Sequence, residues 1–129
     1  MTTLLSRPRL LITGGGGAGS EALYRLLSDR YDVHFADADP DAKPAGVPAV
    51  AWHQLPPASA PDFLEGLARL CRALDIALLV PGVDEELLPV SRARAVLGCE
   101  VLLPPTAFVE AHLDKLASHM LLQSLGTAV

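Results

Sequence analysis

The stretch RLLITGGGGAG, residues 9–19, decides the fold of this chain. Its first part, Arg9–Thr13, is a short apolar run that stops at Gly14, as a buried parallel strand stops at a tight turn. After the glycines, apolar residues recur at helical spacing, at Ala22, Leu23, Leu26 and Leu27. Because a strand, a glycine turn and a helix follow one another, the sequence opens with half of a βαβ unit.

Three more segments contain apolar residues and are bounded by residues typical of turns, as strands are. They are Asp32–Asp37, Asp75–Val80 and Glu100–Leu103. The second of them is apolar almost throughout and stops at Pro81-Gly82, which indicates a strand that is covered on both faces. The third is cut by Pro104-Pro105.

Helices are predicted between these strands. The first ends near Tyr31, and the clearest runs from Pro61 to Leu74. Residues 83–97 predict a turn and then a helix after Pro89. A further helix is predicted after Thr106, with Phe108, Val109, Leu113 and Leu116, and a second helical stretch from Asp114 to Gly126. The Pro- and Ala-rich segment 38–61 predicts a loop with one anchored, extended stretch at Val47, Val50 and Trp52.

Strands that alternate with helices imply right-handed crossovers and a doubly wound parallel sheet of the α/β class. Numbered along the chain, the strands take the order 2-1-3-4, which reverses between the first strand and the third. Ligands of such sheets bind at that reversal, outside the carboxyl ends of the strands. We therefore expect a site between the loops 14–20 and 81–86.

Composition narrows the classes of function. The chain has 129 residues, of which 50% are hydrophobic, which fits one packed domain. Its net charge of −5 disfavours nucleic acid as a partner. Neither a signal sequence nor an apolar run of roughly 18 residues is present, so we expect no membrane partner and a cytoplasmic location.

The cysteines and histidines do not form a catalytic or metal-binding pattern. Cys71 and Cys99 lack the paired spacing of a zinc or redox motif, so we interpret them as inert core thiols. Metal-ligand spacing is also absent from the histidines, which are His34, His53, His112 and His119. We predict neither a metal ligand nor a catalytic residue in this chain.

The glycine loop satisfies the pattern G-x-G-x-x-G with Gly14, Gly16 and Gly19. Such a loop lets an anion approach backbone N–H groups at the positive end of a helix. Asp37 follows near the place where an acid would bind a ribose hydroxyl in a nicotinamide-dependent enzyme. Two interpretations remain: a dinucleotide site, or glycines that serve only the close packing of strand and helix.

The second loop places Asp84, Glu85 and Glu86 after the strand that ends at Val80. Carboxylates repel a pyrophosphate, and they suit an amine, a hydroxyl or a metal ion better. Alternatively, these acids only complement the dipole at the start of a helix.

Five segments together resemble the N-terminal lobe of ATP-grasp ligases, in the branch that includes the carbamoyl-phosphate synthase large subunit and biotin carboxylase. They are LLITGGGGAGSEAL, FADADP, LLVPGVDEELLP, VLLPP and HLDKLASHMLLQSLGTAV. The resemblance implies a Rossmann-like pre-ATP-grasp domain at 1–113 and a connecting helix at 114–129. That helix would lead into an ATP-grasp domain missing from this chain, because residues 127–129 look like the start of another extended segment.

The resemblance also implies roles for individual residues. Gly16 and Gly17 match the loop that abuts a small-molecule acceptor substrate, and Asp84 and Glu85 match acids that contact it in some members. Lys115 matches a basic residue that reaches ATP, whose phosphates it suits chemically. In that family ATP and Mg²⁺ lie between two later subdomains, so we expect neither tight cofactor binding nor ligase activity from this chain alone.

One departure concerns position 17, which is glycine where some members with phosphoribosyl substrates carry an acid. Two rival hypotheses stay open. In the first, the chain is a free-standing NAD- or nucleotide-binding Rossmann module, either epimerase-like or regulatory. In the second, it is an interaction domain whose glycine loop serves packing only. A homodimer is a further candidate partner, since helix faces left bare by a missing lobe can pair.

Overall fold

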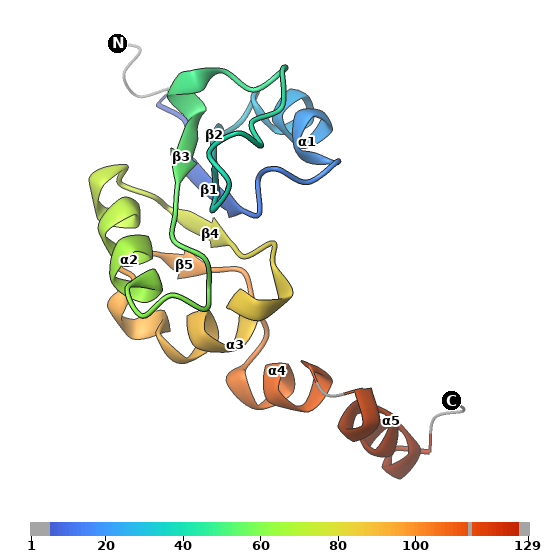
Figure 1. Ribbon diagram of the computed structural model, residues 1–129. Coiled ribbons are helices and arrows are strands. Elements are labelled where there is room, and N and C mark those ends of the chain that lie inside the picture. Colours follow the sequence, from blue (N-terminus) through green and yellow to red (C-terminus); the bar gives the residue numbers. More distant parts are fainter. Residues whose placement is uncertain (1–5, 114, 127–129) are drawn as a thin grey trace.

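The computed structural model describes residues 6–113 and 115–126. Its centre is a parallel sheet of five strands in the order β3-β2-β1-β4-β5 (Figure 1). The strands are β1 (Arg9–Thr13), β2 (Asp32–Asp37), β3 (Trp52–Gln54), β4 (Leu78–Val80) and β5 (Glu100–Val101). The predicted α/β class and doubly wound parallel sheet are confirmed.

The strand order confirms the predicted neighbours and adds one strand at the edge. β1 lies between β2 and β4, and β5 pairs with β4, as expected. β3 is the addition: it pairs with β2 through Phe35 opposite Trp52, and the N–H of Leu55 donates to the carbonyl of Asp37 at 3.0 Å. Of the stretch predicted to be extended, only Trp52 lies in this strand, whereas Val50 lies in the 3-10 helix Ala49–Ala51 and Val47 precedes it. The order reverses at β1 and β4 as expected.

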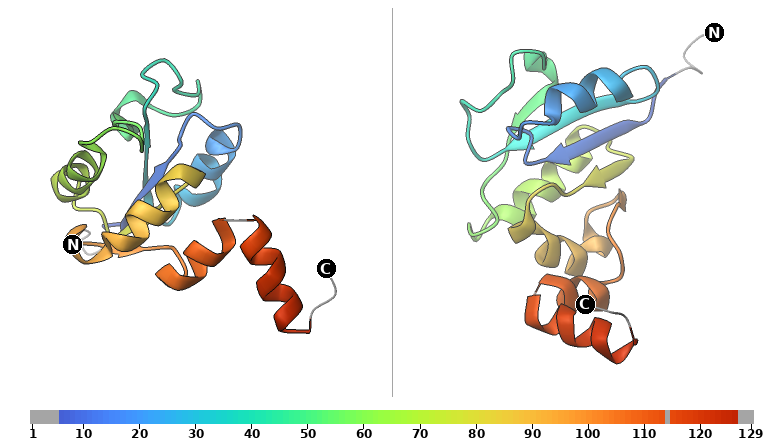
Figure 2. Two further views of the ribbon diagram at one scale, coloured as in Figure 1. Left: turned by 60° about the horizontal axis from the view of Figure 1, so that its bottom comes forward. Right: turned by 90° about the vertical axis from the view of Figure 1, so that its right-hand side faces the viewer.

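The helices cover both faces of this sheet. They are α1 (Ser20–Leu27), α2 (Phe63–Ala73), α3 (Asp84–Arg92), α4 (Thr106–Leu113) and α5 (Lys115–Ser124), with short 3-10 helices at η2 (Ala49–Ala51) and η3 (Arg94–Val96). Figure 2 shows α1 on one side of the sheet, α2 and α3 on the other, and α4 and α5 extending away from it. Among the residues described, no helix has the length and apolar character needed to cross a membrane.

The prediction for α3 was wrong in its start. The helix begins at Asp84, five residues before Pro89, which lies inside it. Proline lacks an N–H group, so the helix forgoes the bond that residue 89 would donate to the carbonyl of Glu85. The three acids of the first turn favour the earlier start because they face the positive end of the helix dipole.

Two hydrophobic clusters form the core, one on each face of the sheet. The larger joins α2 and α3 to β1 and β4 through residues such as Leu67, Leu79 and Val90. The smaller is centred on Phe35. Against it α1 packs Tyr24 and Leu27, whereas Leu23 and Leu26 of the predicted apolar face are 40% and 76% exposed.

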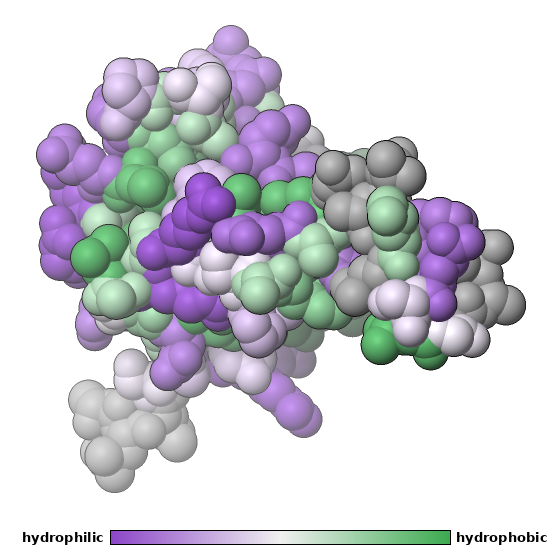
Figure 3. All heavy atoms as spheres, turned by 90° about the horizontal axis from the view of Figure 1, so that it is seen from below, coloured by the Kyte–Doolittle hydropathy of each residue, from purple (hydrophilic) through white to green (hydrophobic). Residues whose placement is uncertain are grey.

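Other large hydrophobic residues are also exposed, among them Phe108 on α4, Met120 on α5 and Leu125 just after α5. Figure 3 shows hydrophobic residues interspersed with hydrophilic ones on the face seen from below. α4 is fixed to α3 by polar contacts: the hydroxyls of Ser91 and Thr106 lie 2.7 Å apart, and Arg92 pairs with Glu110 at 3.1 Å.

Candidate functional site

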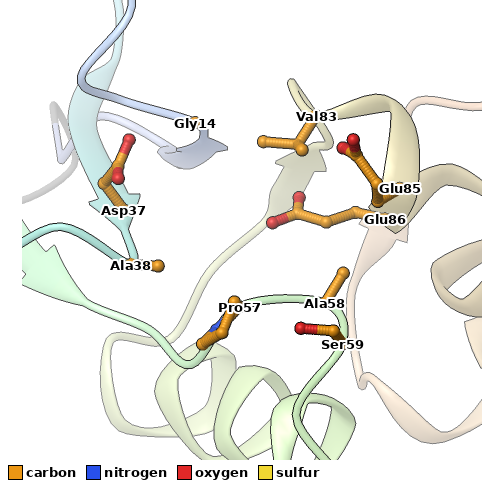
Figure 4. A pocket seen from close by; sticks show the side chains of 9 residues that line it. All are labelled: Gly14, Asp37, Ala38, Pro57, Ala58, Ser59, Val83, Glu85 and Glu86. Atoms are coloured by element: carbon orange, nitrogen blue, oxygen red, sulfur yellow. The ribbon is translucent and has the colours of Figure 1, made fainter.

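A cleft of about 550 Å³ opens at the carboxyl ends of β1, β2 and β4. It is lined by Gly14, Asp37, Ala38, Pro57, Ala58, Ser59, Val83, Glu85 and Glu86 (Figure 4). The glycine loop and the acidic loop thus lie side by side. The segment 57–59, between β3 and α2, forms the third wall and was not predicted.

Main-chain contact sets the spacing of the two loops. A Cβ atom at Gly82 would lie 2.3 Å from the carbonyl oxygen of Thr13, and one at Gly14 would lie 2.8 Å from Val83. Gly14 also has a φ of +68°, a conformation that side chains other than glycine disfavour. Glycine is therefore required at both positions by the approach of the loops to each other.

Glu86 is the buried acid of the cleft. Its exposed fraction is 5%, and Thr13, which donates a hydrogen bond to its Oε1, is 1% exposed. Burial raises the pKa of Glu86, the negative charges of Asp37 and Glu85 raise it further, and the hydrogen bond from Thr13 opposes the increase. Glu86 therefore keeps its proton to a higher pH than an ordinary glutamate.

Asp37 holds the glycine loop in place from the end of β2. Its Oδ2 accepts the N–H of Gly16 at 2.8 Å, and its Oδ1 accepts the N–H of Asp39 at 2.9 Å. The acid expected to bind a ribose in the dinucleotide interpretation is thus engaged with the protein's own backbone.

The N–H groups of the loop are largely used inside the protein as well. Those of Gly15 and Gly17 donate to the carbonyls of Ala36 at 3.0 Å and Gly14 at 3.1 Å, and that of Gly16 is held by Asp37. A phosphate cradle needs free N–H groups that converge on one point. Three consecutive groups of this loop are already committed elsewhere.

The predicted site residues are distributed unevenly around the cleft. Glu85 lines it and Asp84 is exposed outside its lining. Gly16 and Gly17 are exposed and also lie outside that lining; a Cβ at Gly16 would meet Ala42 at 2.6 Å. Lys115 begins α5, but its side chain and all of Asp114 lie outside the described residues.

Thr13 and Glu86 are the functional candidates that sequence reasoning missed as site residues. A signal for Thr13 was present, since it is the polar residue that directly follows the three apolar residues at the centre of β1. Glu86 was noted only as one of three consecutive acids. Which of the three points inward depends on where α3 begins, and that start was misplaced.

The electrostatics of the cleft favour a cation or a hydrogen-bond donor. Its lining contributes the carboxyl groups of Asp37, Glu85 and Glu86, and no Lys, Arg or His is among the nine lining residues. Within residues 6–113 and 115–126, no group of three or more His, Cys, Asp or Glu side chains could hold a metal ion. An amine or a hydroxyl fits this chemistry, and a polyphosphate does not.

The histidine and cysteine pairs lie outside this cleft. His34 and His53 contact each other through ring nitrogens 2.9 Å apart on β2 and β3. Cys71 is buried in the larger cluster, and burial together with the nearby Cys99 raises the pKa of its thiol to about 12. A thiol with so high a pKa is a poor nucleophile at neutral pH.

No protein-family model and no curated protein matches the sequence. Among solved structures, the fold is similar to the biotin carboxylase domain of a single-chain bacterial carboxylase, with a TM-score of 0.68 and 23% identity over 95% of this chain. It is also similar to the enzyme WbmG of Bordetella bronchiseptica in complex with NAD, with a TM-score of 0.54 and 19% identity over 73% of this chain. This chain spans 30% of the first structure and 36% of the second. Both likenesses describe a shared Rossmann-like fold.

Proposed function

We propose that this chain is the N-terminal, substrate-side domain of an ATP-grasp ligase. Residues 1–113 form the domain, and residues 114–129 lead into an ATP-grasp domain. The likeness to the biotin carboxylase domain carries the proposal, because it extends over 95% of this chain. The carbamoyl-phosphate synthase-like branch is the finer assignment that the sequence motifs add.

The cleft supports a role in binding the acceptor rather than ATP. Its carboxyl groups would repel a triphosphate, and they attract an ammonium or accept a hydrogen bond from a hydroxyl. ATP with Mg²⁺ would bind between later subdomains and activate a carboxylate as an acyl phosphate for attack by an amine-type nucleophile. Lys115 would reach ATP from the start of α5, where its ammonium suits a phosphate oxygen.

Within this cleft the acids have different tasks. Glu85 and Glu86 present carboxyl groups to the acceptor, while Asp37 fixes the glycine loop through Gly16. Gly17 and Asp84 lie beside the cleft, where the acceptor or the following domain would pass. The chain alone supplies only part of a ligase active site.

The second candidate is an NAD-binding module, which the likeness to WbmG in complex with NAD favours. The glycine loop argues against this candidate, because its N–H groups at Gly15, Gly16 and Gly17 already donate hydrogen bonds within the protein. An NAD pyrophosphate would have to break these bonds before it could use those groups.

Two measurements separate the candidates. A polypeptide that carries this sequence and the proposed ATP-grasp domain should release ADP only with carboxylate present, and hydroxylamine should trap the activated acyl group as a hydroxamate. The chain alone, titrated with NAD by calorimetry, should show no micromolar binding. Micromolar NAD binding that is weakened by Asp37→Ala, but not by the control change Asp41→Ala on the exposed loop that follows β2, would overturn the ligase proposal.

A further inference from the structure

A hydrogen-bond chain with a fixed direction leads from Gly82 through Thr13 to Glu86, which lines the cleft. The N–H of Gly82 donates to Oγ1 of Thr13 at 3.0 Å, and Oγ1 of Thr13 contacts Oε1 of Glu86. A backbone N–H can only donate, so the threonine oxygen accepts from Gly82. The buried Thr13 hydroxyl must in turn donate a hydrogen bond to an acceptor. In the described part of the chain, the acceptor that it contacts is Oε1 of Glu86.

This direction determines which oxygen of Glu86 can carry a proton. Oε1 accepts the hydrogen bond from the Thr13 hydroxyl. When the carboxyl group of Glu86 is protonated, its own proton therefore resides on Oε2. In the described residues Oε2 has no hydrogen-bond partner, although the side chain as a whole is 5% exposed. Figure 4 shows the carboxyl group of Glu86 pointing from α3 into the cleft.

We propose that Glu86 Oε2 is a proton-holding binding group for a ligand that donates N–H or O–H bonds, and that Thr13 is the positioning residue that reserves this oxygen for the ligand. The inference rests on the proposed function for the identity of the ligand as the acceptor amine. An ammonium that binds Oε2 stabilises the ionised carboxylate, so its binding releases the proton from Glu86 to solvent.

The surroundings of Glu86 are consistent with this role. Asp37 from the end of β2 and Glu85 from α3 face the same space, and both add negative charge that favours the protonated form of Glu86. Segment 57–59 contributes Ser59 but no charge. An incoming ammonium would therefore relieve repulsion among the three acids as well as ionise Glu86.

The test follows the titration of Glu86 by NMR, through the side-chain carboxyl carbon of the labelled protein. In Thr13→Val the midpoint should move to higher pH, because the carboxylate loses the hydrogen bond that favours it, whereas Thr13→Ser should retain the wild-type midpoint. In the wild-type protein the amide proton of Gly82 should titrate with the same midpoint as Glu86, since Thr13 joins them. This wild-type measurement decides the point even where Thr13→Val does not fold.

The ligand class is tested with methylammonium and with tetramethylammonium, which has the same charge but no N–H group. Methylammonium should lower the midpoint of Glu86, and tetramethylammonium at equal ionic strength should not. A Gly82 amide that does not titrate overturns the positioning role of Thr13, and equal effects of the two cations overturn the binding role of Oε2. Neither result depends on ATP turnover, so a failure here is distinct from a failure of the ligase assignment.

Discussion

The contrast between Gly15 and Gly17 gives a sharp test of what the glycine loop is for. A Cβ at Gly15 would lie 2.6 Å from Cβ of Phe35 and 3.1 Å from the Trp52 ring. The first distance is about 1 Å shorter than a favourable carbon–carbon contact. Phe35 is fully buried in the smaller core cluster and cannot move aside. We expect Gly15→Ala to cost about 1–3 kcal/mol, the usual range for overpacking.

Gly17→Ala is the matched control in the same loop. There the nearest atom to an added Cβ is the carbonyl oxygen of Gly14 at 3.4 Å, and φ lies outside the left-handed range. Alanine would restrict the unfolded chain without a clash in the folded one, so we expect a gain of about 0.4–1 kcal/mol.

Urea denaturation followed by the fluorescence of Trp52, the single tryptophan, measures both variants. For a chain of this size, each 1 kcal/mol should also shift Tm by roughly 3–6 °C. The reasoning is refuted if Gly15→Ala is as stable as the wild type or if Gly17→Ala is the less stable variant. If the proposed ligase activity of the longer polypeptide falls in a Gly17→Ala variant that folds well, residue 17 is kept small for a ligand or a neighbouring domain.

Two further predictions concern groups outside the cleft. Burial and the neighbouring His34 lower the pKa of His53 from 6.5, so the unfolded chain binds more protons than the folded one. The free energy of unfolding should therefore fall as pH drops below 6.5. In urea denaturation a His53→Gln variant should show a shallower fall, and an equally steep fall would contradict the assignment. Iodoacetamide at pH 8 should alkylate Cys71 only after unfolding, since the thiol is 3% exposed and its pKa is raised to about 12. Peptide mass spectrometry reads this out, and rapid modification of the native protein would contradict it.

The strands were predictable where an apolar run ends at glycine or proline. Arg9–Thr13 ends at Gly14, and Leu78–Val80 ends at Pro81-Gly82, so both strands and their order could be predicted. β3 was not predicted as a strand, because a three-residue segment such as Trp52–Gln54 shows no period. Its pairing with β2 is a tertiary contact, which a local pattern does not contain.

The site was predictable to the level of loops but not of side chains. The crossover rule places the loops after β1 and β4 at one edge, where the structure has the cleft. Which acid enters it depends on the phase of α3, and Pro89 was misread as the start of that helix. The apolar face predicted for α1 is confirmed at Leu27, which packs inward, but Leu23 and Leu26 are exposed and Tyr24 packs against the core in their place.

The contact between Gly82 and Thr13 separates the width of the cleft from its chemistry. At residue 82 a Cβ would stand 2.3 Å from the carbonyl oxygen of Thr13, so the present separation of the two rims leaves no room for a side chain there. The polarity of the opening comes in part from the side chains of Ser59 and Glu85, which line the cleft without such a contact, whereas Asp37 also holds the glycine loop through the N–H of Gly16. Related proteins could therefore carry other side chains at positions such as 59 and 85 and bind differently charged molecules, while the width of the cleft stays the same.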